Sequence, residues 1–248
     1  MPRRPGPDRD AWRPRECPDQ NSWGGLWQCV ALNRSYPRSA MSKGRVEAFS
    51  DGVFAVAATL LIFNVQIDKT APGELLGALL AAWPKYAVYV ASFLTIGVIW
   101  MNHHGLFERI FHLDRTLVFL NLLLLMAIVF LPFSTAQLGA NIQVPRDANT
   151  VASLYAINAS VIAIFFGAVW TYALTHPRLL VADLDRLAAF RAWPRFSVGT
   201  VVYLACIPLA QSSPIAVVVV CAALAIYYMF ERLPDISRQP AAGTRPHS

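Results

Sequence analysis

The sequence predicts an all-α membrane protein with six transmembrane helices. Of its 248 residues, 56% are hydrophobic and only 15% are charged. The mean hydropathy of +0.43 is too high for a water-soluble domain of this length. The hydrophobic residues gather in separate runs close to the roughly 17–25 residues that cross a hydrocarbon core about 30 Å thick. Because lipid offers the backbone no hydrogen-bond partners, each run is expected to be a helix.

Six runs meet this criterion, and none shows the alternating ten-residue pattern of a membrane β-barrel. In the first, sixteen uncharged residues follow Asp51, and Pro84 before the second suits the first turn of a helix. The fifth is the weakest, because it is short and Pro208 removes a helix hydrogen bond. In chain order the runs are Phe49–Ile67, Tyr86–Met101, Thr116–Leu138, Val151–Leu174, Phe196–Gln211 and Pro214–Phe230.

The basic residues predict that both termini are cytoplasmic. If the runs alternate across the membrane, 18 of the 21 Lys and Arg residues lie on the side of the termini, and only Lys69, Lys85 and Arg146 lie on the other side. Positively charged loops stay in the cytoplasm. The net charge of +6 therefore reflects membrane topology, and we expect no nucleic-acid partner.

The chain divides into three parts. Residues 1–40 are rich in Pro and Arg and have no hydrophobic core, so we expect a disordered arm. Residues 41–232 hold the six runs and form the six-helix domain, and residues 233–248 are expected to be a disordered tail. Because Met41 directly precedes the ordered pattern, we hypothesise that it is the translation start.

No motif of a soluble enzyme is present. The four cysteines form no Cys-x-x-Cys pair, and the sequence lacks a phosphate-binding glycine loop, a His-Glu-x-x-His motif and a nucleophile elbow. We therefore expect no catalytic residue, no metal and no cofactor. Two adjacent histidines could bind haem or a metal, but neighbours on a helix point about 100° apart and do not face one small site.

Polar residues at membrane depth are the candidates for function. Ser50 and Asp51 lie at the cytoplasmic end of the first run, and "WMNHHGLF" ends the second run at the same depth. A carboxylate in the first turn of a helix can simply cap it. However, Phe49 precedes the carboxylate, so it is partly buried and needs donors, which the imidazole, indole and amide groups of the second run supply. We predict a polar network between the two helices.

These residues resemble a known family. "RVEAFSDGVFAVAATLLI" followed by "WPKYAVYVASFLTIGVIWMNHHGLF" is similar to the transmembrane protein 175 family of potassium channels, in its prokaryotic six-helix form. Both signature helices match in order, and the other four agree in hydropathy and loop length. The resemblance implies a homotetramer whose first helices line a central potassium pore. It also implies an inter-helix network in which Arg45, Phe49, Ser50 and Asp51 join Trp100 and His103 or His104. The Asn102 amide is a further donor that the residues themselves suggest for this network.

One stripe of the first helix is the predicted pore lining. Val56, Thr59 and Phe63 recur at helical spacing, and Gly52 continues the stripe toward the cytoplasm. Such a stripe is commonly a packing seam, but the resemblance implies that these positions are the pore layers. The family has Ile or Leu, then Thr, then Leu there. Val56 is smaller and Phe63 is larger, so we expect the tightest ring at Phe63.

Two other functions remain open. A proton-coupled transporter could use the Asp and His residues as a relay, although the sequence shows no inverted repeat or paired broken helices. A non-conducting structural protein is not excluded by the sequence. The expected partners are potassium ions, the lipid bilayer and further copies of the chain, and the expected location is the inner membrane of a prokaryotic cell.

Overall fold

The computed structural model describes residues 42–67, 71–181 and 186–230. The predicted arm 1–40, the start hypothesis at Met41 and the predicted tail 233–248 lie outside these residues. The described part is helical, with one isolated β-bridge between Ile110 and Leu180. Its helices are α2 (Lys43–Leu60), the 3₁₀ helix η2 (Leu61–Asn64), α3 (Leu75–Ala81), α4 (Trp83–Glu108), α5 (Arg115–Asn141), α6 (Ala148–Thr175), the 3₁₀ helix η3 (Pro177–Leu179), α7 (Arg186–Ser212) and α8 (Pro214–Phe230).

Each predicted run coincides with a helix of the structure. Four helical segments, Lys43–Asn64, α4, α5 and α6, are long and apolar enough to cross a membrane, and the apolar segments Ser197–Ser212 and Pro214–Phe230 are shorter. The helices extend beyond the runs at most ends, because polar residues continue a helix outside the lipid. Pro208 does not end α7, which runs through it.

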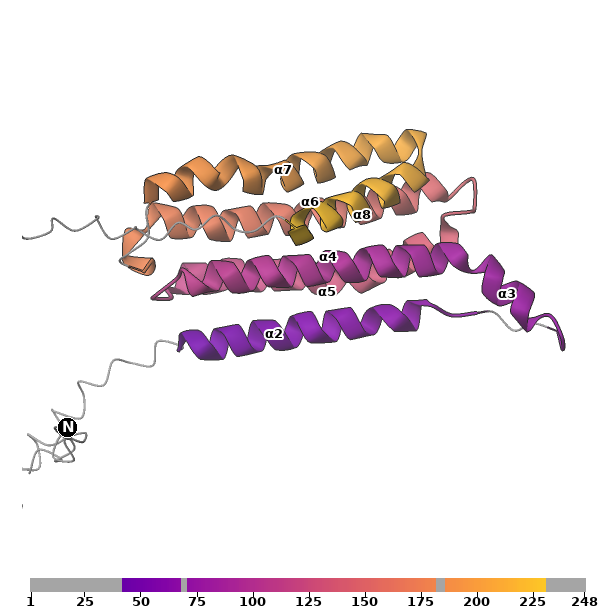
Figure 1. Cartoon of the computed structure of the whole chain (residues 1–248), viewed down its shortest axis with the longest axis horizontal. Helices are drawn as coiled ribbons and strands as arrows, with labels where there is room; N and C mark the ends of the chain where they lie inside the picture. The colour runs from indigo at the N-terminus through magenta and orange to yellow at the C-terminus, as the bar shows by residue number, and fades with distance from the viewer. Residues whose placement is uncertain (1–41, 68–70, 182–185, 231–248) are drawn as a thin grey trace, which may run out of the picture. The chain divides into compact units, whose positions relative to one another are not determined.

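The helices pack side by side in an order that differs from their sequence order. α2 packs against α4 and α5, while α6 packs between α5 and α7 (Figure 1). α8 returns to contact α4 as well as α6 and α7. The main hydrophobic core is made of buried residues from all of these helices, among them Phe54, Ile128 and Tyr155.

α5 contains a proline in its interior, Pro132. Proline has no N–H, so the carbonyl of Ile128 loses the partner that it would have in a regular α-helix. The neighbouring rung is bridged by the side-chain amide of Asn158 from α6. With its oxygen toward the Leu131 N–H, this amide accepts at 3.2 Å and donates to the Ala127 carbonyl at 3.1 Å. An interhelical side chain thus satisfies the backbone where the proline weakens it.

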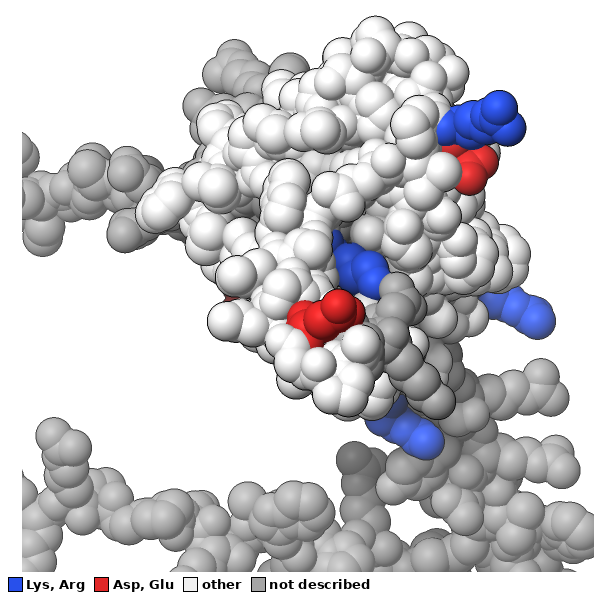
Figure 2. Space-filling model, turned by 90° about the vertical axis from the view of Figure 1, so that its right-hand side faces the viewer, with Lys and Arg blue, Asp and Glu red and all other residues white. Residues whose placement is uncertain are grey.

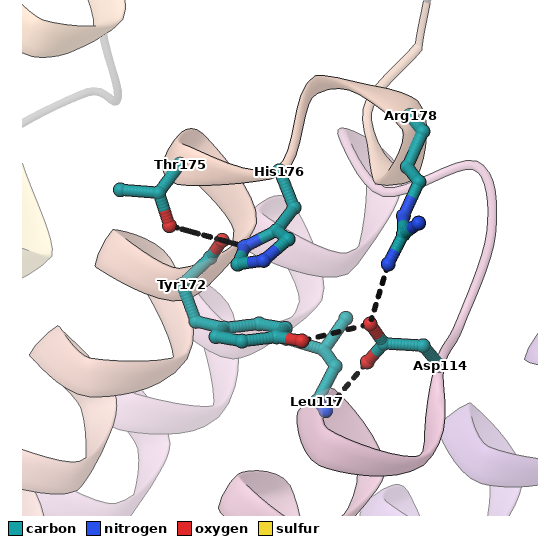
Figure 3. Close-up of polar contacts among 6 residues, drawn as sticks. All are labelled: Asp114, Leu117, Tyr172, Thr175, His176 and Arg178. Atoms are coloured by element: carbon teal, nitrogen blue, oxygen red, sulfur yellow. Dashed lines mark hydrogen bonds and ion pairs between the residues drawn. The ribbon is translucent and has the colours of Figure 1, made fainter.

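The loops that follow α4 and α6 are joined through one carboxylate. Asp114 caps α5 by accepting from the Leu117 N–H at 2.9 Å, and it accepts from the Tyr172 hydroxyl of α6 at 2.8 Å (Figure 3). Arg178 lies 3.9 Å from the same carboxylate, and the β-bridge joins the same two loops. These contacts fix the α4–α5 turn to the end of α6.

The opposite end of the bundle carries α3, a short helix without a buried residue. Seen from that end, the described surface is mostly uncharged, with a few blue and red groups (Figure 2). The side chains of Leu76 and Leu80 are each 69% exposed there. This end therefore offers an apolar surface rather than a charged one.

Candidate functional site

α2 has one buried face and one exposed face. Its buried residues are Val46, Ser50, Phe54 and Ala57, continued by Leu61 of η2. Gly52, Val56, Thr59 and Phe63, the predicted pore stripe, each follow one of these by two positions, which places them about 200° around the helix. All four are exposed, Val56 at 55% and Phe63 at 68%.

The exposed face makes α2 the least covered of the four long helices. Only 28% of its apolar stretch is buried, against 39–44% for α4, α5 and α6. A polar face turned toward water would explain the low buried share of α2, but its exposed residues are mainly apolar. The stripe is therefore free to contact lipid, a pore or another copy of the chain.

A buried chain of hydrogen bonds joins α2, α5 and α4. The Ser50 hydroxyl donates to the Val46 carbonyl at 2.9 Å, and the Asn121 amide donates to the Ser50 oxygen at 3.0 Å. His103 Nε2 lies 2.8 Å from the Asn121 Oδ1. Because that oxygen can only accept, His103 carries its proton on Nε2. Ser50 and Asn121 are fully buried and His103 is 2% exposed.

Aromatic rings hold His103 in place. The ring of Phe54 on α2 lies 5.3 Å from the imidazole, and Phe107 on α4 stacks on it at 4.3 Å with an angle of 24° between the planes. Both phenylalanines are buried. The imidazole is therefore positioned by packing as well as by its hydrogen bond.

Asp51 makes a separate and more exposed contact. The Trp100 indole N–H donates to its Oδ1 at 2.9 Å. Trp100 stacks on His104 at 6.2 Å, and His104 lies 3.5 Å from Glu108. The indole thus connects a carboxylate about two turns inside α2 to the last turns of α4. Because α2 begins at Lys43 and has no acidic residue in its first turn, Asp51 does not cap the helix.

The structure brings together most of the predicted network but divides it in two. Ser50 and His103 are in the buried chain, and Asp51, Trp100 and His104 are in the exposed group. The hydrogen bonds place Trp100 on Asp51, whereas the expected histidine partner binds Asn121. Three predicted members make none of these side-chain hydrogen bonds: Arg45 and Phe49 are exposed, and Asn102 is half-buried.

Asn121 is the member of the buried chain that the sequence analysis does not identify. A signal was available, because it lies in a long apolar run where an unpaired amide is costly. The sequence did not indicate which helix it faces.

Two side chains in the C-terminal half of the segment Lys43–Asn64 make further hydrogen bonds. The Thr59 hydroxyl donates to the Val56 carbonyl at 2.9 Å, so its oxygen lone pairs remain free on the exposed face. Asn64, the last residue of η2, donates from Nδ2 to the Pro132 carbonyl of α5 at 2.7 Å. The helical segment is therefore tied to its neighbours at two places, by Asn121 at Ser50 and by Asn64 at the end of η2.

The part of the chain that carries these groups matches a family model. The model described as "Endosomal/lysosomal potassium channel TMEM175" covers residues 45–132, which include both networks and the Asn64 contact. A crystal structure of a lysosomal potassium-selective channel TMEM175 homolog from Chamaesiphon minutus has a similar fold. Its TM-score is 0.68 at 37% identity, over 75% of this chain and 96% of that one.

Curated relatives extend the similarity to nearly their whole length. A potassium channel of Streptomyces collinus is 40% identical over 200 residues, which is 80% of this chain and 97% of the relative. A potassium channel of Chamaesiphon minutus is 39% identical over 188 residues, 75% of this chain and 92% of the relative. The human "Endosomal/lysosomal proton channel TMEM175" is 37% identical over 145 residues, and these cover only 29% of that longer protein.

Replacing Asn121 tests the buried chain. Asn121→Leu keeps the volume but leaves the His103 N–H and the Ser50 oxygen without their partner. We expect the free energy of unfolding to fall by about 1–3 kcal/mol. Trp100→Phe, which removes only the exposed bond to Asp51, is the control and should cost less than about 1 kcal/mol. Thermal unfolding of the detergent-purified variants measures both. Equal effects of the two substitutions would contradict a dominant role for the buried chain.

Proposed function

Because the chain belongs to the TMEM175 family, we propose that it forms a leak-type potassium channel in which four copies surround a pore lined by α2. The observation that supports this most directly is the exposed stripe of α2, which lies opposite the face that packs on α4 and α5. In this proposal each subunit crosses the membrane six times, with α7 and α8 as the last two spans.

The stripe would supply three layers of side chains to the pore. In a fourfold assembly Val56, Thr59 and Phe63 each become a ring of four. Rings of apolar side chains exclude bulk water, so an ion must lose part of its hydration shell to pass. Phe63, the larger and more exposed of the two apolar residues, would form the narrowest ring, at the outer end.

The Thr59 ring would provide the selectivity. Its hydroxyl hydrogen is held by the Val56 carbonyl, so the hydroxyl oxygen faces the exposed side as an acceptor. Four such oxygens could replace part of the water around a cation. Potassium gives up its water at lower cost than sodium, so partial replacement favours potassium without any backbone-carbonyl filter.

The charges support an orientation with the termini in the cytoplasm of a prokaryotic cell. The end of the bundle that holds the start of α2 and the end of α4 carries Lys43, Arg45 and Arg109, and Arg115 and Arg178 belong to the same end. At the other end the described basic residues are Lys85 and Arg146. Basic residues mark the cytoplasmic side of an inner-membrane protein.

Proton movement is the second candidate function, because the vertebrate relatives are named proton channels. It includes the proton-coupled transporter that the Asp and His residues suggest. Liposomes loaded with potassium separate the possibilities. Potassium efflux that needs no proton exchange supports the channel, whereas flux that stops when protons cannot exchange supports the transporter.

Thr59→Ala should lower the preference for potassium while conduction persists, because the pore keeps its width but loses the four oxygens. The reversal potential of the purified channel in a planar bilayer, with potassium on one side and sodium on the other, measures this preference. Thr175→Ala is a matched control, because the Thr175 hydroxyl also donates to a backbone carbonyl three residues earlier, at 2.9 Å, but lies at the end of α6. A Thr59→Ala channel as selective as the parent would rule out the hydroxyl ring.

Substitutions in the two apolar rings should change different properties of the pore. Phe63→Ala removes the largest side chains of the pore and should raise the single-channel conductance, whereas Val56→Asn makes that ring polar and should admit sodium. Phe93→Ala on the exposed side of α4 is the control and should do neither.

If cysteines at positions 56, 59 and 63 all resist water-soluble thiol reagents in a conducting channel, the stripe does not line the pore.

A further inference from the structure

The C-terminal end of α2 is held by a contact of Asn64, a residue outside the proposed pore stripe. α2 becomes the 3₁₀ helix η2 at Leu61, and Phe63 lies within this last turn. Leu61 is fully buried, while Phe63 is 68% exposed. Short 3₁₀ segments have weaker hydrogen bonds than an α-helix. The direction of Phe63 therefore depends on what fixes η2 from outside.

Asn64 supplies that fixation. Its side-chain amide is half-buried and donates to the Pro132 carbonyl at 2.7 Å, a short bond that joins η2 to α5 directly after Phe63. The next backbone bond, from the Val65 N–H to the Ile62 carbonyl at 3.0 Å, closes the end of η2 itself. Without the Asn64 donor, η2 would keep the burial of Leu61 and, two residues beyond Asn64, the bond from Lys85 Nζ to the Gln66 carbonyl at 2.7 Å.

The acceptor of this bond is the carbonyl of Pro132, where α5 lacks one backbone hydrogen bond. Pro132 leaves the Ile128 carbonyl without its helix partner, and Asn158 from α6 bridges the adjacent rung, Ala127 to Leu131. Sharp helix bends occur where a proline or an inserted side chain interrupts the ladder. The position of the Pro132 carbonyl is therefore set partly by Asn158, which is 5% exposed and belongs to α6.

We propose that Asn64 and Asn158 are positioning residues that set the width of the outer constriction. Asn158 fixes the backbone of α5 next to Pro132, the Pro132 carbonyl holds Asn64, and Asn64 holds η2 so that Phe63 points along the stripe. This inference rests on the proposed function, in which Phe63 forms the narrowest ring. It adds that two side-chain amides, neither in contact with the ion, determine the width of the Phe63 ring.

Single-channel recording of purified variants tests the proposal, because the conductance of one open channel does not depend on how much protein assembles. Asn64→Leu removes the donor at nearly constant volume, and Asn158→Leu releases α5 from the α6 side. Each should raise the potassium conductance by roughly two- to tenfold and lower the preference for potassium over sodium, because the Phe63 ring loses its fixed direction. Asn141→Leu is the control: its amide donates to the Gln137 carbonyl within the same helix at 2.9 Å, so conductance should not change.

A double substitution shows whether the amides act through Phe63. In a Phe63→Ala background, Asn64→Leu should add no further change. If both single variants conduct like the parent, the inference is overturned. It is also overturned if Asn64→Leu raises conductance as much in the Phe63→Ala background as in the parent. Failure of both variants, but not of Asn141→Leu, to assemble would also overturn it, because the bonds would then serve assembly only. If Phe63→Ala itself leaves conductance unchanged, the proposed pore is wrong instead.

Discussion

A polar group at membrane depth must find its partner within the protein, since the lipid offers none. The arrangement of this chain follows from that constraint. Ser50, Asn121 and His103 satisfy one another across α2, α5 and α4, and Asn158 satisfies backbone groups beside Pro132. Each amide belongs to one helix and finds its partners on another. The helices are therefore held in a particular rotation, which apolar packing alone does not specify.

The fixed rotation decides which face of α2 stays uncovered. Ser50 must face Asn121, so Val46, Phe54, Ala57 and Leu61 enter the core on the same side. The opposite residues, among them Val56 and Phe63, then stay more than half exposed in the described chain. A helix held by polar bonds at Ser50 and at Asn64 can present an apolar face that a loosely packed helix would turn inward. The free face is thus a result of the bonds on the other side.

The helices and their order were predictable from the sequence, because lipid imposes their length and apolar composition. The contact between Asp51 and Trp100 was also predictable, since two antiparallel helices bring the first half of one and the last turns of the other to one depth. The division of the network was not. Which of two adjacent histidines faces inward, and whether Asn121 or Asp51 meets it, depends on helix rotation, which depth and spacing do not define. Pro132 was overlooked, since the Asn158 amide that bridges the neighbouring rung, Ala127 to Leu131, comes from a residue 26 positions later.

The buried chain also has a direction. Every group in it gives its hydrogen the same way, from His103 to Asn121, from Asn121 to Ser50, and from Ser50 to the Val46 carbonyl. A hydroxyl or an imidazole can accept a hydrogen ion on one side and release another on the opposite side. The amide of Asn121 cannot, because neither its nitrogen nor its oxygen takes up or releases a proton near neutral pH. Hopping along these side chains stops at Asn121, so the bonds that hold three helices together do not form a proton wire.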